Sequence, residues 1–188
     1  MKPGECILFS GGAAGAEAAF GACAERHGVE EVNFTFDGHF DVRHRGVRVL
    51  NHEELQTGDV SLEYVAKLLN RHYTEGPKIR KVLQTLWYQV NSGQEIYVIG
   101  TILDDKTVRG GTGWGAEFAK LCNKPLHVFD QDKDSWFKWS ADAWQKLGAP
   151  GSTDAPVITH PHFTGTGTRR MQDNGTRAID QLFDRSFT

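Results

Sequence analysis

The sequence predicts an α/β fold of the Rossmann-like type, with a mostly parallel sheet and helices on both faces. Short apolar runs alternate with amphipathic helical patterns along most of the chain, which is typical of a parallel sheet covered on both sides. Three Gly-rich turns lie where a predicted strand gives way to a helix. Because the carboxyl ends of parallel strands share one edge, the three turns should meet there, where such sheets bind ligands.

Composition and charge exclude several classes of protein. The 188 residues carry a net charge of −3, so we expect one domain over residues 1–188, no general affinity for nucleic acid and none for anionic membranes. No apolar run is long enough to span a bilayer. The three cysteines (Cys6, Cys23 and Cys122) are scattered and odd in number. We therefore expect reduced, mostly buried thiols in a cytoplasmic protein.

The first strand–turn–helix unit begins near the amino terminus. Residues 6–10 form a short apolar run, a Gly-rich turn follows, and the next helical pattern ends at Gly28. Residues 32–36 alternate like another strand. The segment 37–59 predicts an irregular insertion with a short strand at 47–50.

Two helices are expected before the central strand. Ser61 is a good N-cap for a helix that reaches residue 73. Pro77 suits the first position of the next helix, which carries one apolar face and a second stripe of mixed polar and aromatic residues. The apolar face is Ile79, Val82, Leu83, Leu86 and Val90, and the second stripe is Arg80, Gln84, Trp87 and Asn91. We predict that this stripe is either a solvated flank or a pocket wall.

The central turn, residues 108–115, connects the strand predicted at 95–103 to a helix. Its glycines permit a sharp turn and close approach of a ligand. The helix then directs free N–H groups and a positive dipole end at that ligand, so the turn predicts an anion site, with phosphate the usual anion. Glu117 lies one turn into the helix, and its carboxylate should reach the same pocket, for ribose hydroxyls or for proton transfer.

The last third of the chain contains a strand at 126–129 and a Trp-rich lobe over residues 131–154. This lobe should lock onto the core, with base stacking or a dimer contact as alternatives. A last strand is predicted at 157–162, followed by the third turn at 163–169 and a helix from Met171.

Several well-known motifs are missing. No P-loop lysine, no six-residue dinucleotide fingerprint and no nucleophile elbow is present, so an NTPase, an NAD dehydrogenase or a serine hydrolase is not expected. The histidines lack zinc-like spacing, and we expect no metal site. His160 and His162 precede the third turn and would be able to face the ligand.

The turns resemble those of one superfamily. Residues 10–17, Ser-Gly-Gly-Ala-Ala-Gly-Ala-Glu, resemble the first turn of the SLOG superfamily of Rossmann-like nucleotide-binding proteins. That superfamily includes DNA-processing protein A, the Lonely Guy phosphoribohydrolases and molybdenum-cofactor carriers. Residues 110–117, Gly-Gly-Thr-Gly-Trp-Gly-Ala-Glu, are similar to the Lonely Guy glycine motif, with Trp114 in place of its threonine. Arg80-Lys81 looks like the Arg-Lys pair of those enzymes.

The third turn resembles the Gly-Ser/Thr-Arg turn that opens the DNA-processing fold, where it comes first rather than last. A circularly permuted order, with residues 157–163 as the usual first strand, would account for this. From the three turns and the neighbouring helix, the predicted ligand-binding residues are Gly11, Gly12, Ala13, Gly15, Glu17, Arg80, Gln84, Gly110, Gly111, Thr112, Gly113, Trp114, Glu117, Thr166, Gly167, Thr168 and Arg169.

The main hypothesis is a protein that binds a nucleotide or nucleotide-derived ligand, to sense, carry or sequester it, and that requires no cofactor. The turn amides would bind the phosphate, and Arg80 or Arg169 would offset its charge. Glu117 would accept from the ribose hydroxyls, and Trp87 or Trp114 would stack on the base. A second hypothesis, implied by the resemblance, is a phosphoribohydrolase that cleaves the N-glycosidic bond of nucleoside 5′-monophosphates, with Glu117 and Arg80 catalytic. A third is a molybdenum-cofactor carrier, and the resemblance also implies a homodimer.

Overall fold

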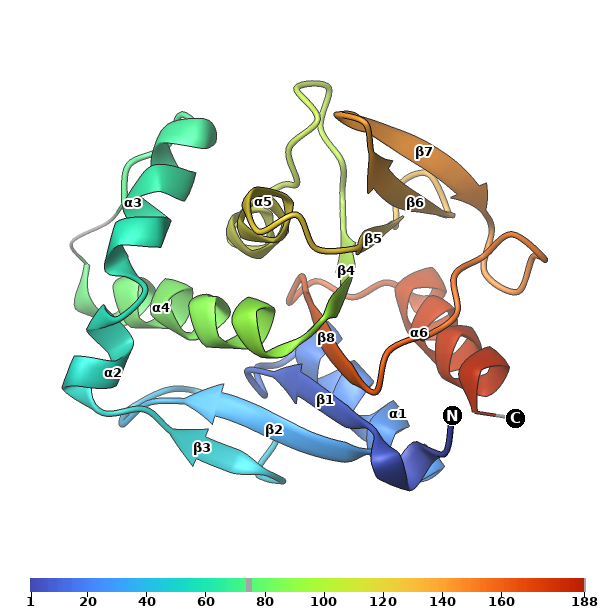
Figure 1. Ribbon diagram of the computed structural model, residues 1–188, viewed down its shortest axis with the longest axis horizontal. Helices are drawn as coiled ribbons and strands as arrows, with labels where there is room; N and C mark the ends of the chain where they lie inside the picture. Colours follow the sequence, from blue (N-terminus) through green and yellow to red (C-terminus); the bar gives the residue numbers. More distant parts are fainter. Residues whose placement is uncertain (74–75, 188) are drawn as a thin grey trace.

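The computed structural model describes residues 1–73 and 76–187. Its centre is an eight-stranded sheet in the order β3-β2-β1-β8-β4-β5-β6-β7 (Figure 1). The first six strands in this order are parallel, and β6 and β7 are added antiparallel at one edge. The predicted Rossmann-like α/β class is therefore confirmed.

The strands are β1 (Ile7–Ser10), β2 (Glu30–Thr35), β3 (Val47–Val49), β4 (Glu95–Gly100), β5 (Leu126–Asp130), β6 (Ser135–Ser140), β7 (Ala143–Gly148) and β8 (His162–Gly167). The helices are η1 (Pro3–Glu5), α1 (Ala16–His27), α2 (His52–Gln56), α3 (Asp59–Leu68), α4 (Pro77–Ser92), α5 (Thr112–Leu121) and α6 (Asp173–Ser186).

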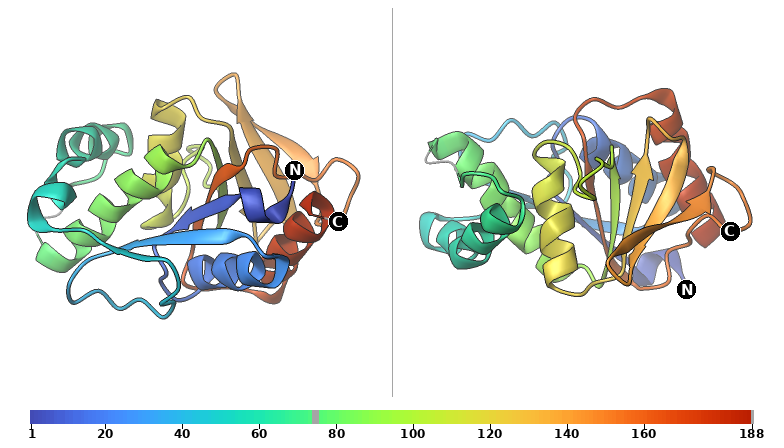
Figure 2. Two further views of the ribbon diagram at one scale, coloured as in Figure 1. Left: turned by 60° about the horizontal axis from the view of Figure 1, so that its bottom comes forward. Right: turned by 90° about the horizontal axis from the view of Figure 1, so that it is seen from above.

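Helices cover both faces of the sheet (Figure 2). The central strand β4 shows why, because its alternate side chains enter two separate apolar clusters. Tyr97 and Ile99 pack with α1 and α6, whereas Ile96 and Val98 pack with α3, α4 and α5. A strand buried on both faces reads as a continuous apolar run. The strand predicted at 95–103 is present, and it ends at Gly100.

The amino-terminal unit follows the prediction. After β1, helix α1 ends at Gly28, which adopts a left-handed conformation with φ 74°. The segment 37–59 is more regular than expected, because it contains the predicted β3 and also the short helix α2. Asn51 and Glu54 form a capping box at the start of α2, a sequence signal that we did not use.

The two expected helices are present with shifted boundaries. Helix α3 begins at Asp59, not after Ser61, and ends at Leu68. Pro77 begins α4 as predicted. The part of the α3 prediction at residues 69–73 is wrong, since the chain turns at Asn70 with φ 50°.

The Trp-rich lobe is a β-hairpin that extends the sheet. β6 and β7 pair antiparallel across a turn at Ala141 and Asp142, which both have positive φ. Trp139 and Trp144 face each other across the strands with ring centroids 5.0 Å apart, and Trp136 is buried in the core. The lobe therefore packs on the core, and the hairpin was missed because its two-residue turn contains no glycine.

The last strand corrects the prediction at 157–162. Strand β8 comprises residues 162–167 and lies in the middle of the sheet, between β1 and β4. Gly165 lies within this strand. The position requires glycine because α1 packs directly on it, and a Cβ there would lie 2.5 Å from the Phe20 ring. The third predicted turn is therefore mostly strand, and only residues 168–172 turn toward α6, which begins at Asp173 rather than Met171.

No helix among residues 1–73 and 76–187 is both long and apolar enough to cross a membrane.

Candidate functional site

A cavity of about 550 Å³ lies at the carboxyl edge of the sheet. Gly100 at the end of β4, Gly167 at the end of β8 and Ala13 after β1 all contribute to it. The predicted meeting of the three turns at one edge is therefore confirmed. The sheet topology also favours a ligand site here. The chain continues from β1 to β2 on one side and from β4 to β5 on the other, and parallel α/β sheets bind ligands at the point where these directions diverge.

The lining comes from five segments. Residues from the β1–α1 turn, α4, the β4–α5 turn, the end of β5 and the β8–α6 turn line the cavity: Ala13, Glu17, Ile79, Val82, Leu83, Leu86, Gly100, Thr101, Arg109, Gly110, Gly111, Thr112, Gln131, Asp132, Thr166, Gly167, Thr168, Arg169, Arg170 and Gln172.

Positive charge dominates the polar part of this cavity. Arg109, Arg169 and Arg170 line it, against the two carboxylates of Glu17 and Asp132. Arg109 and Asp132 form a loose, exposed ion pair at 3.8 Å. Over residues 1–73 and 76–187, Arg169 and Arg170 form no ion pair, so their guanidinium groups remain available to an anion.

The β4–α5 turn is open to the cavity. Gly110 and Gly111 are exposed, and a Cβ on either would meet nothing within 4 Å. The first N–H groups of a helix have no intrahelical acceptor, so the start of α5 presents donors and a positive dipole end there. The turn is held from behind by Arg71, whose guanidinium donates to the carbonyl oxygens of Gly110 at 2.7 Å and Val108 at 3.3 Å.

Gly113 supports the turn and does not line the cavity. A Cβ at this position would lie 2.0 Å from the carbonyl oxygen of Val108, so only glycine allows the strand exit and α5 to come this close.

The β1–α1 turn is closed by the Glu17 side chain and by main-chain contacts from other segments. The N–H of Ala13 donates to Glu17 Oε2 at 2.9 Å, and the N–H of Ala16 donates to the Thr168 carbonyl at 3.0 Å. Gly12 accepts from the N–H groups of Val42 and Arg43.

Gly11, Gly12 and Gly15 therefore lie behind the cavity and do not line it. Gly15 contacts the backbone of Thr168 and Arg169 so closely that a Cβ would lie 2.5 Å from both. The amide site that we expected at this turn is already occupied by a carboxylate from the protein.

Glu17 is the one carboxylate buried in the cavity wall. It is 8% exposed, and it accepts a second hydrogen bond from the Thr166 hydroxyl at 3.0 Å. Burial raises the pKa of Glu17, although hydrogen bonds from Ala13, Thr166 and Gln89 and the charge of Arg169 oppose the shift. A buried carboxyl with a raised pKa beside a cavity is a functional-site candidate on physical grounds.

Helix α4 supplies the apolar wall through Ile79, Val82, Leu83 and Leu86. Its second stripe faces α3 instead. Arg80 and Gln84 both donate to Asp59 at 2.8 Å, and Arg80 lies over the Tyr73 ring. The hydrogen bonds outweigh burial and lower the pKa of Asp59. Arg80 and Gln84 therefore lie outside the cavity and form a contact with α3, whereas Asn91 at the end of the stripe is exposed.

Glu117 also lies outside the cavity, contrary to our expectation. Its carboxylate accepts from Lys120 at 3.0 Å, and Lys120 lies 4.0 Å from the Trp139 ring centroid. Residue 117 is thus on the side of α5 that faces the β6–β7 hairpin. The expected stacking residues are elsewhere too, because Trp114 is buried against Tyr73, and Trp87 packs on Tyr88 and Gly58.

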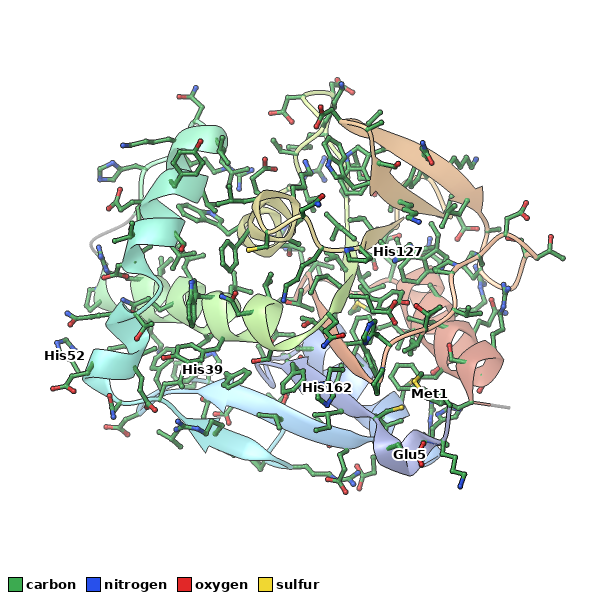
Figure 3. The ribbon with its side chains drawn as sticks, in the orientation of Figure 1. Met1, Glu5, His39, His52, His127 and His162 are labelled. Atoms are coloured by element: carbon green, nitrogen blue, oxygen red, sulfur yellow. The ribbon has the colours of Figure 1, made fainter. Side chains whose placement is uncertain are left out.

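The histidines are dispersed (Figure 3). His162 begins β8 at the amino edge of the sheet, and His160 donates its N–H to Glu95 there, so neither faces the cavity. His127 is buried with a pKa lowered to about 4 by that burial. In the described part of the chain, no three His, Cys, Asp or Glu side chains gather so that they could hold a metal ion.

Several lining residues were not found from the sequence. Arg170 and Gln172 were absent from the prediction because their turn was placed too early along the chain. Gln131 is buried, donates to the Arg170 carbonyl at 3.1 Å and accepts from the Gln172 N–H at 2.8 Å, so it fixes the turn between β8 and α6. Arg71 had no sequence signal, since its role depends on a contact with residues nearly forty positions away.

Fold and cavity together define a Rossmann-like α/β protein with a positively charged cavity at the carboxyl edge of its sheet. No family model matches the chain, and no curated protein or solved structure matches it either.

Proposed function

We propose that the protein binds a nucleotide or a nucleotide-derived ligand that contains phosphate, in the cavity at the carboxyl edge of the sheet. One observation carries this proposal. Three arginines and the open amino end of α5 line the same cavity as an apolar wall from α4. The resemblance of the glycine turns to the SLOG superfamily supports the same function.

The phosphate would lie at the β4–α5 turn. Main-chain N–H groups of Gly111 and Thr112 and the guanidinium groups of Arg109 and Arg169 would bind it, since helix amino ends and arginine forks both favour phosphate oxygens. The volume of about 550 Å³ is suited to a ligand larger than free phosphate.

The rest of the ligand would lie against α4. Val82, Leu83 and Leu86 offer an apolar surface to a base. Thr166 and Glu17 line the same cavity, where hydroxyl groups of a sugar would find acceptors.

Calorimetric titration with adenosine, guanosine, cytidine and uridine 5′-monophosphates in phosphate-free buffer tests the proposal. We expect at least one to bind, and Arg169→Gln to weaken it by about tenfold, the loss of one charge-assisted pair. Arg177→Gln is the matched control, because Arg177 lies on α6 with a long 3.5 Å contact to Asp134 and does not line the cavity. Absence of binding to all four and to their 5′-diphosphates, or equal effects of both variants, would contradict the proposal.

A second candidate function is favoured by Glu17. A buried carboxyl with a raised pKa, beside the expected sugar, is suited to acid–base chemistry on an N-glycosidic bond. If the protein is a phosphoribohydrolase, Glu17 rather than Glu117 would be the carboxyl at the reacting centre, because Glu117 faces the β6–β7 hairpin.

Chromatography of a nucleoside 5′-monophosphate after incubation with the protein separates the two candidates. Release of free base that is lost in Glu17→Gln and kept in Glu117→Gln would support the enzyme. Binding without release of base would support the first candidate alone.

As the resemblance implies, we also propose a homodimer, and the three free cysteines fit the proposed cytoplasmic location. The Trp-rich lobe is a candidate contact between the two copies, and its Trp139 and Trp144 are half-buried against Lys120 of the same chain. Sedimentation equilibrium of the wild type would show a mass of about 42 kDa, twice the 20.9 kDa of one chain, if a dimer forms.

A further inference from the structure

A second, smaller hollow adjoins the cavity. It has a volume of about 120 Å³ and is lined by His39, Phe40, Lys78, Ile79, Val82 and Arg169. Ile79, Val82 and Arg169 also line the main cavity. A ligand in the main cavity would therefore reach this hollow without crossing a separate wall.

Among the described residues that line the hollow, no acid faces its hydrogen-bond donors. Lys78 and Arg169 contribute positive charge. Asp41 is near enough to His39 to oppose the lowering of its pKa, but its carboxylate pairs with His44 at 3.6 Å. Within residues 1–73 and 76–187, the two cations of this hollow therefore have no carboxylate partner, a composition that favours binding of an anion.

His39 adds a third donor. Its Nδ1 is 3.0 Å from the Thr35 hydroxyl, while its Nε2 is buried and has no hydrogen-bond partner in the described part of the chain. If the Thr35 hydroxyl donates to Nδ1, the ring carries its proton on Nε2, which then needs an acceptor. Burial and the charges of Arg169 and Lys78 lower the pKa of His39 and outweigh the opposing charge of Asp41. The lowered pKa favours the neutral ring. Figure 3 shows His39 between β2 and α4.

The exposed apolar side chains around this hollow also point to a ligand. Phe40 is 74% exposed and Ile79 is 62% exposed. The ammonium group of Lys78 lies 3.5 Å from the centroid of the Phe40 ring, and this cation–π contact positions the lysine at the hollow.

We propose that the ligand carries two anionic groups, the first at the β4–α5 turn and the second, of phosphate size, in the hollow between Lys78, His39 and Arg169. Arg169 would contact both groups, because it lines both spaces. This rests on the proposed function and deepens it, since it selects nucleoside bisphosphates, diphosphates and their derivatives over monophosphates.

The test compares ligands that differ only in the second anion. Adenosine 5′-monophosphate, adenosine 5′-diphosphate and adenosine 3′,5′-bisphosphate are titrated calorimetrically, with the guanosine series in parallel, against the wild type, Lys78→Gln and Lys67→Gln. Lys67 is an exposed lysine on α3 that lines neither space, and serves as the matched control. Lys78 is itself exposed on α4, so its substitution should leave the fold intact.

We expect at least one two-anion ligand to bind the wild type about tenfold more tightly than the monophosphate, a difference of about 1.4 kcal/mol. Lys78→Gln should remove most of this gain and change monophosphate affinity less than about twofold, because an exposed charge that makes no contact adds little. Lys67→Gln should change neither.

Three results would overturn the inference. The first is that the second anion brings no gain in affinity in either series. The second is that the gain in affinity persists in Lys78→Gln, and the third is that Lys78→Gln weakens the binding of all ligands equally. If a monophosphate still binds in those cases, the proposed function stands without the second subsite. If no ligand of either series binds, the proposed function fails together with the inference.

Discussion

The β1–α1 and β4–α5 turns have similar sequences, Gly-Gly-Ala-Ala-Gly-Ala-Glu and Gly-Gly-Thr-Gly-Trp-Gly-Ala-Glu, and opposite structural roles. In the first, Glu17 folds back and accepts from the N–H of Ala13, while Thr168 accepts from Ala16. In the second, Glu117 points away toward Lys120, and Gly110 and Gly111 remain exposed. One turn contains its own anion, and the other leaves a place for one.

The difference shows that a Gly-rich strand–helix turn is not by itself a phosphate site. Amide donors at the amino end of a helix bind whichever acceptor is nearest. At the β1–α1 turn an intramolecular carboxylate and a carbonyl are held in place by the fold. Four experiments would break or sharpen this comparison.

The largest effect is expected from alanine at the closed turn. Gly15→Ala forces a residue with φ 93° to carry a Cβ that overlaps Thr168 and Arg169, which should lower the free energy of unfolding by about 2–4 kcal/mol. Gly111→Ala, at φ −60° with open space around the Cβ, should be nearly neutral. Urea unfolding measures both, and equal losses would show that the turns do not differ in packing.

A smaller loss is expected when the internal anion is removed. Glu17→Ala leaves the N–H of Ala13 and the hydroxyl of Thr166 without their acceptor, at a cost of about 1–3 kcal/mol. Glu117→Ala removes a largely buried pair with Lys120, but the Lys120 ammonium keeps the Lys106 carbonyl oxygen and the Trp139 ring as partners, so the cost should be about 1 kcal/mol. Thermal or urea unfolding of the two variants would decide, and a larger loss in Glu117→Ala would reverse our assignment of the two glutamates.

Support of the open turn should affect binding more than folding. Arg71→Ala removes the hydrogen bonds to the carbonyls of Gly110 and Val108, so the start of α5 is less well ordered and nucleotide affinity should fall by about three- to tenfold. Calorimetric titration with a nucleotide that binds the wild type measures this loss of affinity. Arg48→Ala is the control, because Arg48 lies on the edge strand β3, pairs with Glu54 and does not line the cavity. The same loss of affinity in this variant would show that the effect is not specific to the turn.

The smallest effect is a change in pH dependence. Burial raises the pKa of Glu17 in the folded protein, so the unfolded chain loses this proton at a lower pH than the folded chain does. The folded state therefore loses stability as pH rises above the ordinary glutamate value of about 4.3. Glu17→Gln does not titrate, and its stability should improve relative to the wild type from about pH 4 to pH 7. Urea unfolding at both pH values checks this, and a constant difference would contradict it.

Much of the fold was predictable from the sequence because the relevant forces are local. The apolar runs of β1, β4 and β5, Pro77 at the start of α4 and Gly28 at the end of α1 each depend on a few neighbouring residues. The alternation of strands and helices then predicts a parallel sheet, and a parallel sheet brings the three turns to one edge.

The candidate site was only partly predictable, because it depends on contacts between distant segments. The turns supplied Ala13, Glu17, Gly110 and Arg169, but helical spacing alone could not tell which face of α5 or α4 would meet the cavity. Glu117 and Arg80 were therefore expected in the cavity and lie outside it.

The sequence by itself determined that this chain forms a parallel α/β sheet whose glycine turns converge, because hydrophobic periodicity and turn chemistry act over short stretches of chain. Tertiary structure alone decided which of the two similar turns is open. It inserted β8 between β1 and β4, which brought the Thr168 carbonyl and the Thr166 hydroxyl to α1. The N–H of Ala16 donates to the distant Thr168 carbonyl, and Glu17 accepts from the Thr166 hydroxyl, 149 residues away along the chain. No local pattern encodes such contacts.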